Sequence, residues 1–178
     1  MSIESRFVSD SAFEYLLREI LQYEAPSSSS RDEKDIRQAS TTRLEAMGQD
    51  IGYRIVERMT EKQKFIGFED LDYVKYICRE FWEMIFGKKI DKLQTNHKGV
   101  FVLFDLEFKL IEKYTSGIPV QQMDTATRDA VTKLLYFPCG IIRGALANLG
   151  MNALVTADFT APPSVTFNVR RKIQDVRV

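Results

Sequence analysis

The stretch that decides the fold is "LYFPCGIIRGALANLGM", residues 135–151, in which three glycines, a cysteine and an arginine interrupt an apolar run. Proline suits the first turn of a helix, where a missing N–H costs nothing, and glycine suits the position that ends a helix. Pro138 and Gly150 are placed in this way. The stretch therefore predicts a buried helix over about residues 139–149.

Two of the glycines, Gly140 and Gly144, lie four residues apart and share one face of that helix. Small residues there let a second helix or the sheet approach closely. Arg143 points elsewhere, with its stem on apolar surface and its charged head paired or hydrated. Cys139 would need a base to act as a nucleophile, and the single histidine, His97, lies in the turn-like tetrapeptide "NHKG". We therefore interpret the set as a close-packing helix with an inert, buried cysteine.

The N-terminal part of the chain predicts a helix over residues 11–25, capped by Asp10. The serine-rich segment over about residues 26–41 is too polar to bury much surface, so we expect a flexible loop within a single domain, 1–178. One apolar stripe marks the first helix: Phe13, Leu16, Leu17, Ile20 and Leu21.

Residues 42–60 and 70–86 predict two more helices, and Gly87 would end the second of them. The first carries Gly48 and Gly52 on one face. Each glycine costs a helix up to about 1 kcal/mol relative to alanine, so a closely packed neighbour is expected there. The apolar positions of this helix are Leu44, Met47, Ile51, Ile55 and Met59.

The second half of the chain predicts mainly strands. Residues 91–114 predict a hairpin or meander around "NHKG", and residues 115–131 are polar with weak helical character. Residues 152–172 predict two strands joined at Pro162 and Pro163. Helices first and strands later indicate an α+β fold, with an antiparallel sheet packed on helices.

Composition excludes several functions. Lysine plus arginine and aspartate plus glutamate balance at 25 each, so no overall basic field exists to hold nucleic acid. Two cysteines and one histidine are too few for a typical zinc site, and no Gly-rich phosphate loop is present. The chain has no run of about 18 apolar residues and no signal-like start. We expect no metal, no cofactor, no nucleic acid partner, no transmembrane segment and no enzymatic activity.

The aromatic side chains Phe81, Trp82 and Phe86 leave two interpretations open. They suit a packed core, which is the common use of such residues. They would also suit a pocket, which would make the chain a small hydrophobic-ligand binding or sensor domain. No convergent set of polar residues indicates the trigger that such a sensor needs.

Three segments resemble the small subunits of the TRAPP (transport protein particle) family. "FPCGIIRGALANLGM" resembles the Cys-Gly-aliphatic-aliphatic-Arg-Gly-Ala-Leu helix of these subunits. "AMGQDIGYRIVERMT" is similar to their second helix, with its Gly-Tyr-Arg pattern at Gly52, Tyr53 and Arg54. "YICREFWEMIFGKKIDKLQTNHKGVFVLFD" resembles the subunit 6 type in particular. The resemblance runs from about residue 10 to the C-terminus, and the serine-rich segment interrupts it.

The resemblance implies helices packed on one side of a twisted antiparallel sheet. It also implies a non-enzymatic subunit of a cytoplasmic tethering complex, peripheral at the cis-Golgi and endoplasmic reticulum, that supports Rab GTPase exchange from surfaces on other subunits. The implied partner is a second small subunit, of the type that carries an acyl chain on cysteine. The resemblance aligns Gly67 with the acylated position, which implies that this chain offers no thiol there. Self-association of the isolated chain stays open.

The first two predicted helices carry more apolar surface than one core needs, and such surface usually marks an interface. The third helix and the 139–149 helix are apolar enough to cover the sheet themselves. We therefore expect the partner to contact a set of five residues on the first two helices: Leu16, Leu17, Ile20, Ile51 and Ile55. The alternative is that all five belong to the core.

Overall fold

The computed structural model describes residues 33–61, 67–96, 98–115 and 122–172, together with Tyr15 and Glu19. The chain divides into two compact units, residues 1–40 and 41–178. In the first unit, Tyr15 and Glu19 are helical and exposed, and helix α2 (Glu33–Thr60) begins. The rest of the helix predicted over residues 11–25 lies outside the described residues, as does His97.

The loop expected over residues 26–41 needs a correction, because α2 begins at Glu33. Its first nine residues, "EKDIRQAST", contain glutamate, lysine, arginine, glutamine and alanine, all of which favour helix. A polar composition argues against burial but not against a helix. The remaining part of the expected loop, residues 26–32, lies outside the described residues.

The second unit is built on a four-stranded sheet in the order β1-β2-β4-β3, with every neighbouring pair antiparallel. The strands are β1 (Lys92–Thr95), β2 (Val100–Asp105), β3 (Ala153–Ala161) and β4 (Ser164–Arg171). Both predicted turns are confirmed: the "NHKG" segment joins β1 to β2, and Pro162 and Pro163 join β3 to β4.

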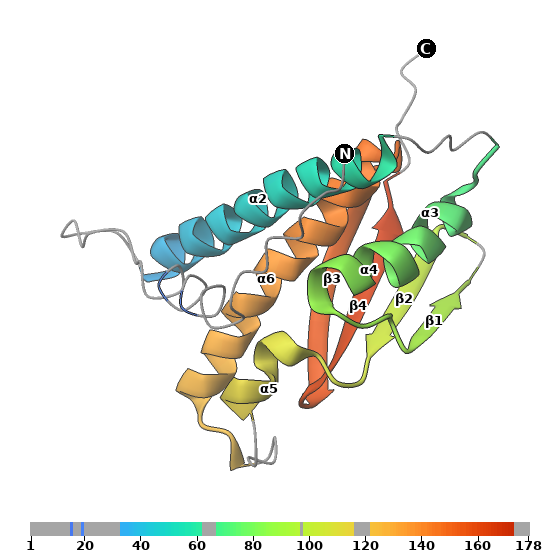
Figure 1. Ribbon diagram of the computed structural model, residues 1–178. Helices are drawn as coiled ribbons and strands as arrows, with labels where there is room; N and C mark the ends of the chain where they lie inside the picture. The colour runs from blue at the N-terminus through green and yellow to red at the C-terminus, as the bar shows by residue number, and fades with distance from the viewer. Residues whose placement is uncertain are drawn as a thin grey trace. The chain divides into compact units, whose positions relative to one another are not determined.

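Helices cover one face of this sheet (Figure 1). They are α3 (Asp70–Tyr76), the π-helical turn η1 (Ile77–Phe81), α4 (Trp82–Phe86), α5 (Lys109–Thr115) and α6 (Thr125–Asn148). Helix α6 packs on β3, while Trp82 of α4 contacts Asp105 of β2 and Phe167 of β4. The predicted α+β fold is confirmed.

The helix predicted over residues 70–86 begins and ends where expected, but its middle is a π-helical turn. A capping box at Glu69 and Asp72 starts it, and Gly87, with φ of 70°, ends it. The π-helical turn η1 was not predicted, because hydrophobic spacing does not distinguish it from an α-helical turn. The Cys78 carbonyl of this turn accepts a hydrogen bond from the Ile90 N–H, at 2.8 Å, which ties the connection after α4 to the helix.

Helix α6 is longer than the sequence indicated. It begins at Thr125, where the Asp124 side chain accepts a hydrogen bond from the Thr127 N–H. The prediction that Pro138 lies in the first turn is therefore wrong, since Pro138 lies buried inside the helix. Burial of the surrounding apolar side chains offsets the backbone hydrogen bond that proline cannot donate. Gly150, with φ of 97°, follows the end of the helix as expected. Residues 109–114, expected within the hairpin or meander region, form most of α5 instead.

The core lies between the sheet and the helices, and aromatic side chains fill one part of it. The Trp82 ring lies 4.3 Å from Phe86, 5.9 Å from Phe108 and 5.3 Å from Phe167, measured between centroids. Phe81 is also fully buried. Rings at these distances contact one another. The arrangement favours the interpretation of this cluster as packed core over that of a ligand pocket.

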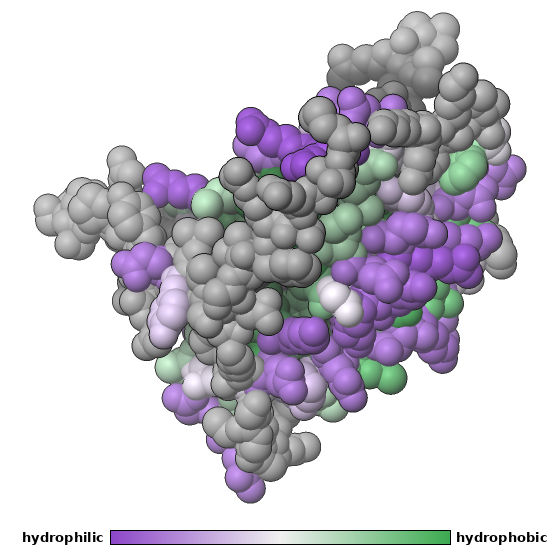
Figure 2. All heavy atoms as spheres, viewed as in Figure 1, coloured by the Kyte–Doolittle hydropathy of each residue, from purple (hydrophilic) through white to green (hydrophobic). Residues whose placement is uncertain are grey.

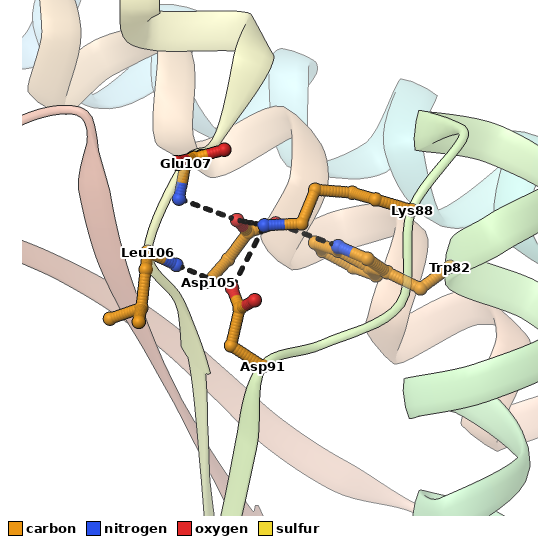
Figure 3. A network of polar contacts seen from close by, with 6 residues as sticks. All are labelled: Trp82, Lys88, Asp91, Asp105, Leu106 and Glu107. Carbon is orange, nitrogen blue, oxygen red and sulfur yellow. Dashed lines mark hydrogen bonds and ion pairs between the residues drawn. The ribbon is translucent and has the colours of Figure 1, made fainter.

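A buried carboxylate anchors the same corner of the fold (Figure 3). Asp105 is completely buried and accepts hydrogen bonds from the Trp82 indole N–H, at 2.8 Å, and from Lys88 Nζ, at 2.7 Å. Lys88 also contacts Asp91, which accepts a hydrogen bond from the Leu106 N–H. Burial alone would lower the pKa of Lys88, but its two carboxylate partners raise it. The pKa of Asp91 is lowered, since the hydrogen bonds from Lys88 and Leu106 outweigh its burial.

Replacing Asp105 with alanine is expected to lower the free energy of unfolding by about 2–3 kcal/mol, because the Trp82 N–H would stay buried without an acceptor. Urea denaturation measures this change. Glu107→Ala is the matched control, since the Glu107 side chain is exposed in the adjacent turn and only its backbone N–H contacts Asp105. An equal loss in both variants would contradict an anchoring role for the buried carboxylate.

Candidate protein interface

Helices α2 and α6 cross at four glycines. A Cβ added to Gly48 would lie under 3.0 Å from the Phe137 carbonyl oxygen of α6, and one added to Gly52 would lie equally close to the Ile141 backbone. Real Cβ atoms essentially never lie so close to other atoms. The two helices therefore touch through their backbones at this pair of glycines.

The α6 side of the crossing is built in the same way. A Cβ on Gly140 would meet the Glu45 carbonyl of α2, and one on Gly144 would meet the Gln49 carbonyl. A step of four residues along α6 thus matches a step of four residues along α2, so the two helices run in the same direction here. The structure brings the two glycine pairs of the sequence analysis into one contact.

An ion pair flanks the crossing. Arg143 donates a hydrogen bond from its guanidinium to the Glu45 carboxylate of α2 at 2.7 Å. Both side chains are partly exposed, so the pair adds orientation more than stability. Cys139 lies buried near the crossing. Burial raises the pKa of its thiol, and the Glu45 charge raises it further. Burial likewise raises the pKa of Cys78 to about 12.

A neutral, buried thiol has little reactivity. Cys139→Ser is expected to cost about 1–3 kcal/mol of stability, because the serine hydroxyl is buried more unfavourably than the thiol. Native-state labelling with a thiol reagent, mapped by peptide mass spectrometry, should leave Cys139 unmodified over minutes. Rapid labelling of Cys139 in the folded chain would show an accessible thiol and contradict this account.

Next to the crossing, α2 presents an apolar stripe, which we define as Met47, Ile51, Ile55 and Met59. Met47 is 41% exposed and Ile51 is 39% exposed, while Ile55 and Met59 are half-buried. Figure 2 shows apolar surface between the C-terminal half of α2 and the hydrophilic outer surface of α3 and α4. This stripe is the candidate interface, because large apolar side chains at regular helical spacing remain in contact with solvent.

Charged side chains border the stripe. Arg43, Asp50, Arg54 and Arg58 are exposed on α2, and helical spacing places Arg54 and Arg58 on the outward side beside Met47 and Ile51. A polar, charged rim around an apolar centre is the usual anatomy of a protein–protein interface.

The structure places some of the predicted interface residues and not others. Ile51 and Ile55 lie in the α2 stripe, whereas Leu16, Leu17 and Ile20 lie outside the described residues. Leu44, which shares their helix, is buried instead. Met47 and Met59 were not named as interface residues, although their spacing of four from Ile51 and Ile55 could have indicated them.

Comparison with known proteins decides the family. The model of the family described as "Transport protein particle (TRAPP) component" matches residues 13–173. This chain belongs to the TRAPP component family. Its relatives share much of its length. Trafficking protein particle complex subunit 6b of Danio rerio is 35% identical over 160 residues, which cover 90% of this chain and 95% of the relative.

Two further relatives support the subunit 6 type. Subunit 6B of Homo sapiens is 40% identical to this TRAPP chain over 128 residues, covering 72% of the chain and 76% of the relative. Subunit 6A of Homo sapiens is 38% identical over 126 residues, covering 71% and 74%. The chain is thus a small TRAPP subunit that resembles subunit 6.

A solved structure shares the fold. It is subunit 3 of the trafficking protein particle complex from Naegleria fowleri, covalently bound to palmitic acid, with a TM-score of 0.61 and 18% identity. The match covers 91% of this TRAPP chain and 94% of the other. In this chain Gly67 lies exposed in the segment between α2 and α3, with φ of 77°.

Within the described ranges, no group of three or more histidine, cysteine, aspartate and glutamate side chains could hold a metal ion. Helix α6 is long and apolar enough to cross a membrane, but 67% of its most apolar window is buried inside the protein. Its packing on β3 and α2 accounts for that apolar character.

Proposed function

We propose that this chain is a non-enzymatic adaptor subunit of a TRAPP tethering complex that acts between the endoplasmic reticulum and the Golgi. The single observation that carries the proposal is the exposed apolar stripe on α2, in a chain whose relatives are named as subunits of a trafficking complex. An apolar stripe with a charged rim is a docking surface, and an adaptor needs one.

The partner that fits is another small TRAPP subunit of the acyl-carrying type, in a 1:1 heterodimer. The subunit 3 structure from Naegleria fowleri is named as covalently bound to palmitic acid. The family resemblance aligns Gly67 of this chain with the acylated position, so this chain would offer no thiol there. The partner would then carry the lipid, and this chain would supply the second half of the dimer. Self-association of the isolated chain would use the same stripe in the partner's absence.

The stripe is long enough for this task. Met59 lies twelve residues after Met47, which is about 18 Å along an α-helix. A stable interface buries about 800 Å² on each partner. The stripe supplies part of that area, and the apolar residues predicted on the first helix, Leu16, Leu17 and Ile20, would supply more. The whole chain would then act as the single domain that the sequence predicts.

The complex would stay in the cytoplasm and reach the membranes of the cis-Golgi and endoplasmic reticulum as a peripheral assembly. Membrane association would come through the complex, since α6 serves as a core helix in this chain. The Rab GTPase exchange surface would lie on other subunits, which this chain supports by holding the assembly together.

The isolated chain is expected to leave the rate of nucleotide release from a Rab GTPase unchanged, because the family resemblance implies that the exchange surface lies on other subunits. Release of a fluorescent GDP analogue measures this rate. The complete assembly serves as the positive control, and the assembly without this chain should be less active or incompletely formed. Exchange by the isolated chain at the rate of the full assembly would contradict the adaptor function.

A further inference from the structure

The outer face of the sheet, turned away from the helices, carries an unexpected apolar row. A sheet with one face in water normally alternates apolar inward and polar outward residues. Strand β4 follows this rule, since its outward residues are Ser164, Thr166, Asn168 and Arg170. Strand β2 does not follow it. Its outward residues are Val100, Val102 and Phe104, all half-buried.

Strand register extends this row across the sheet. Val100 pairs with Arg170 on β4, and Arg170 pairs with Leu154 on β3. Leu154 is 42% exposed. The outward residues of β2 and β3 thus add apolar surface on both sides of Arg170. Within the part of residues 41–178 that the structure describes, no helix covers this face (Figure 1).

Basic side chains gather at the Val100 end of this face. Arg170 and Lys172 are exposed at the end of β4, and Lys98 is exposed in the turn before β2. Hydrogen bonds bring these segments together: the Arg171 N–H donates to the Gly99 carbonyl at 2.8 Å. Arg171 itself turns to the helical side and pairs with Asp70. Among the described residues, Arg170 makes no ion pair.

Along the described strands, the rest of the face carries one further basic residue, Lys92, and one acidic residue, Asp158. Lys92 on β1 lies 5.7 Å above the Phe104 ring, in a cation–π contact. Asp158 on β3 is the one acidic residue among the outward positions of the four described strands. An apolar centre with a basic margin is complementary to a protein surface with an apolar centre and an acidic margin.

We propose that this outer face, centred on Val102 and Arg170, docks a second protein subunit of the same assembly, one that presents apolar side chains bordered by carboxylates. The proposal rests on the proposed function and extends it. The face lies across the sheet from the helical layer to which the α2 stripe belongs, so the chain holds one neighbour on each side. Such a chain is a bridge between two subunits.

A protein fits this face better than a membrane does. The apolar residues lie in the middle of a broad sheet, on a β-branched and aromatic strand, and the basic cluster lies at one end. A lipid surface would need the charges around the whole margin and would leave the Asp158 end facing anionic headgroups. A protein partner that presents carboxylates only opposite the basic cluster avoids both of these difficulties.

The test uses the purified heterodimer of this chain with its small-subunit partner, added to the remaining co-expressed subunits of the same organism's TRAPP assembly. Arg170→Glu and Val102→Glu should each weaken binding to those subunits by at least tenfold, while the heterodimer keeps its mass. Higher salt should weaken wild-type binding, as expected for charge complementarity. Arg79→Glu, an exposed reversal on the helical side, is the matched control and should bind normally.

The possible results distinguish failure of this proposal from failure of the proposed function. Unchanged binding by Arg170→Glu and Val102→Glu would overturn the proposal. If Val102→Glu fails to fold, Arg170→Glu alone still tests the proposal, because Arg170 is exposed. Binding of wild type to phosphatidylserine vesicles that Arg170→Glu abolishes would assign the face to a membrane and overturn it as well. Loss of a homodimer in these variants would also overturn it. Failure of wild type to form any heterodimer would instead count against the proposed function.

Discussion

Gly144→Val is expected to lower the free energy of unfolding by about 3 kcal/mol, which makes it one of the most damaging single substitutions in α6. The added side chain would occupy the space of the Gln49 carbonyl on α2, and a backbone cannot rotate away as a flexible side chain can. The two helices would have to separate, and the Arg143–Glu45 pair beside them would be pulled apart.

Urea denaturation of the full chain measures this loss. Ala130→Val is the matched control, because Ala130 is exposed on the same helix and valine there costs only the difference in helix propensity, about 0.5 kcal/mol. Gly140→Val should behave like Gly144→Val, since it meets the Glu45 backbone. Similar small losses in all three variants would show that the crossing is looser than the structure indicates.

Ile51→Asp is expected to weaken the heterodimer by about 100-fold, because a carboxylate would replace an apolar contact at the centre of the stripe and would lose its water on binding. Ile51 is 39% exposed in the chain, so the unbound variant should keep its fold. Surface plasmon resonance against the small-subunit partner measures the change in Kd.

The control for this variant is Met84→Asp. Met84 is 65% exposed on α4, outside the stripe, and should tolerate the same change without loss of affinity. Equal denaturation midpoints for wild type and Ile51→Asp would exclude unfolding as the cause. An unchanged Kd for folded Ile51→Asp would remove the stripe from the interface.

Local spacing predicted much of the fold. Glycines four residues apart on two helices indicated close approach, and the structure places Gly48 and Gly52 against α6. Turn residues predicted the two hairpins, and Gly87 and Gly150 marked the ends of their helices. These features depend on backbone geometry that a few residues determine by themselves.

Other features could not be predicted, because tertiary packing overrides local preference. Pro138 is a poor interior residue for a helix, yet α6 continues through it because its neighbours are buried on several sides. The polar start of α2 gave no apolar periodicity, although its residues form helix. The π-helical turn η1 has a carbonyl, that of Cys78, which accepts a hydrogen bond from Ile90, twelve residues away, and local spacing does not reveal such a contact.

The candidate interface also combines features that the sequence predicted with features that only the structure shows. Helical spacing indicated that Ile51 and Ile55 share a stripe, but only the structure shows that Leu44 turns inward while Met47 remains exposed. The outer face of the sheet was not predicted at all. "VFVLFD" indicated a strand, and the exposure of alternate residues depends on which face of that strand the helices cover.

We expect this chain to form one half of a heterodimer through the α2 stripe. Light scattering during size-exclusion chromatography, with the chain co-expressed with a small TRAPP subunit of the acyl-carrying type from the same organism, tests it most directly. Wild type should give one particle with the mass of one copy of each subunit, and Ile51→Asp should give two separate peaks. Separate peaks for wild type, or an undivided particle for Ile51→Asp, would contradict it.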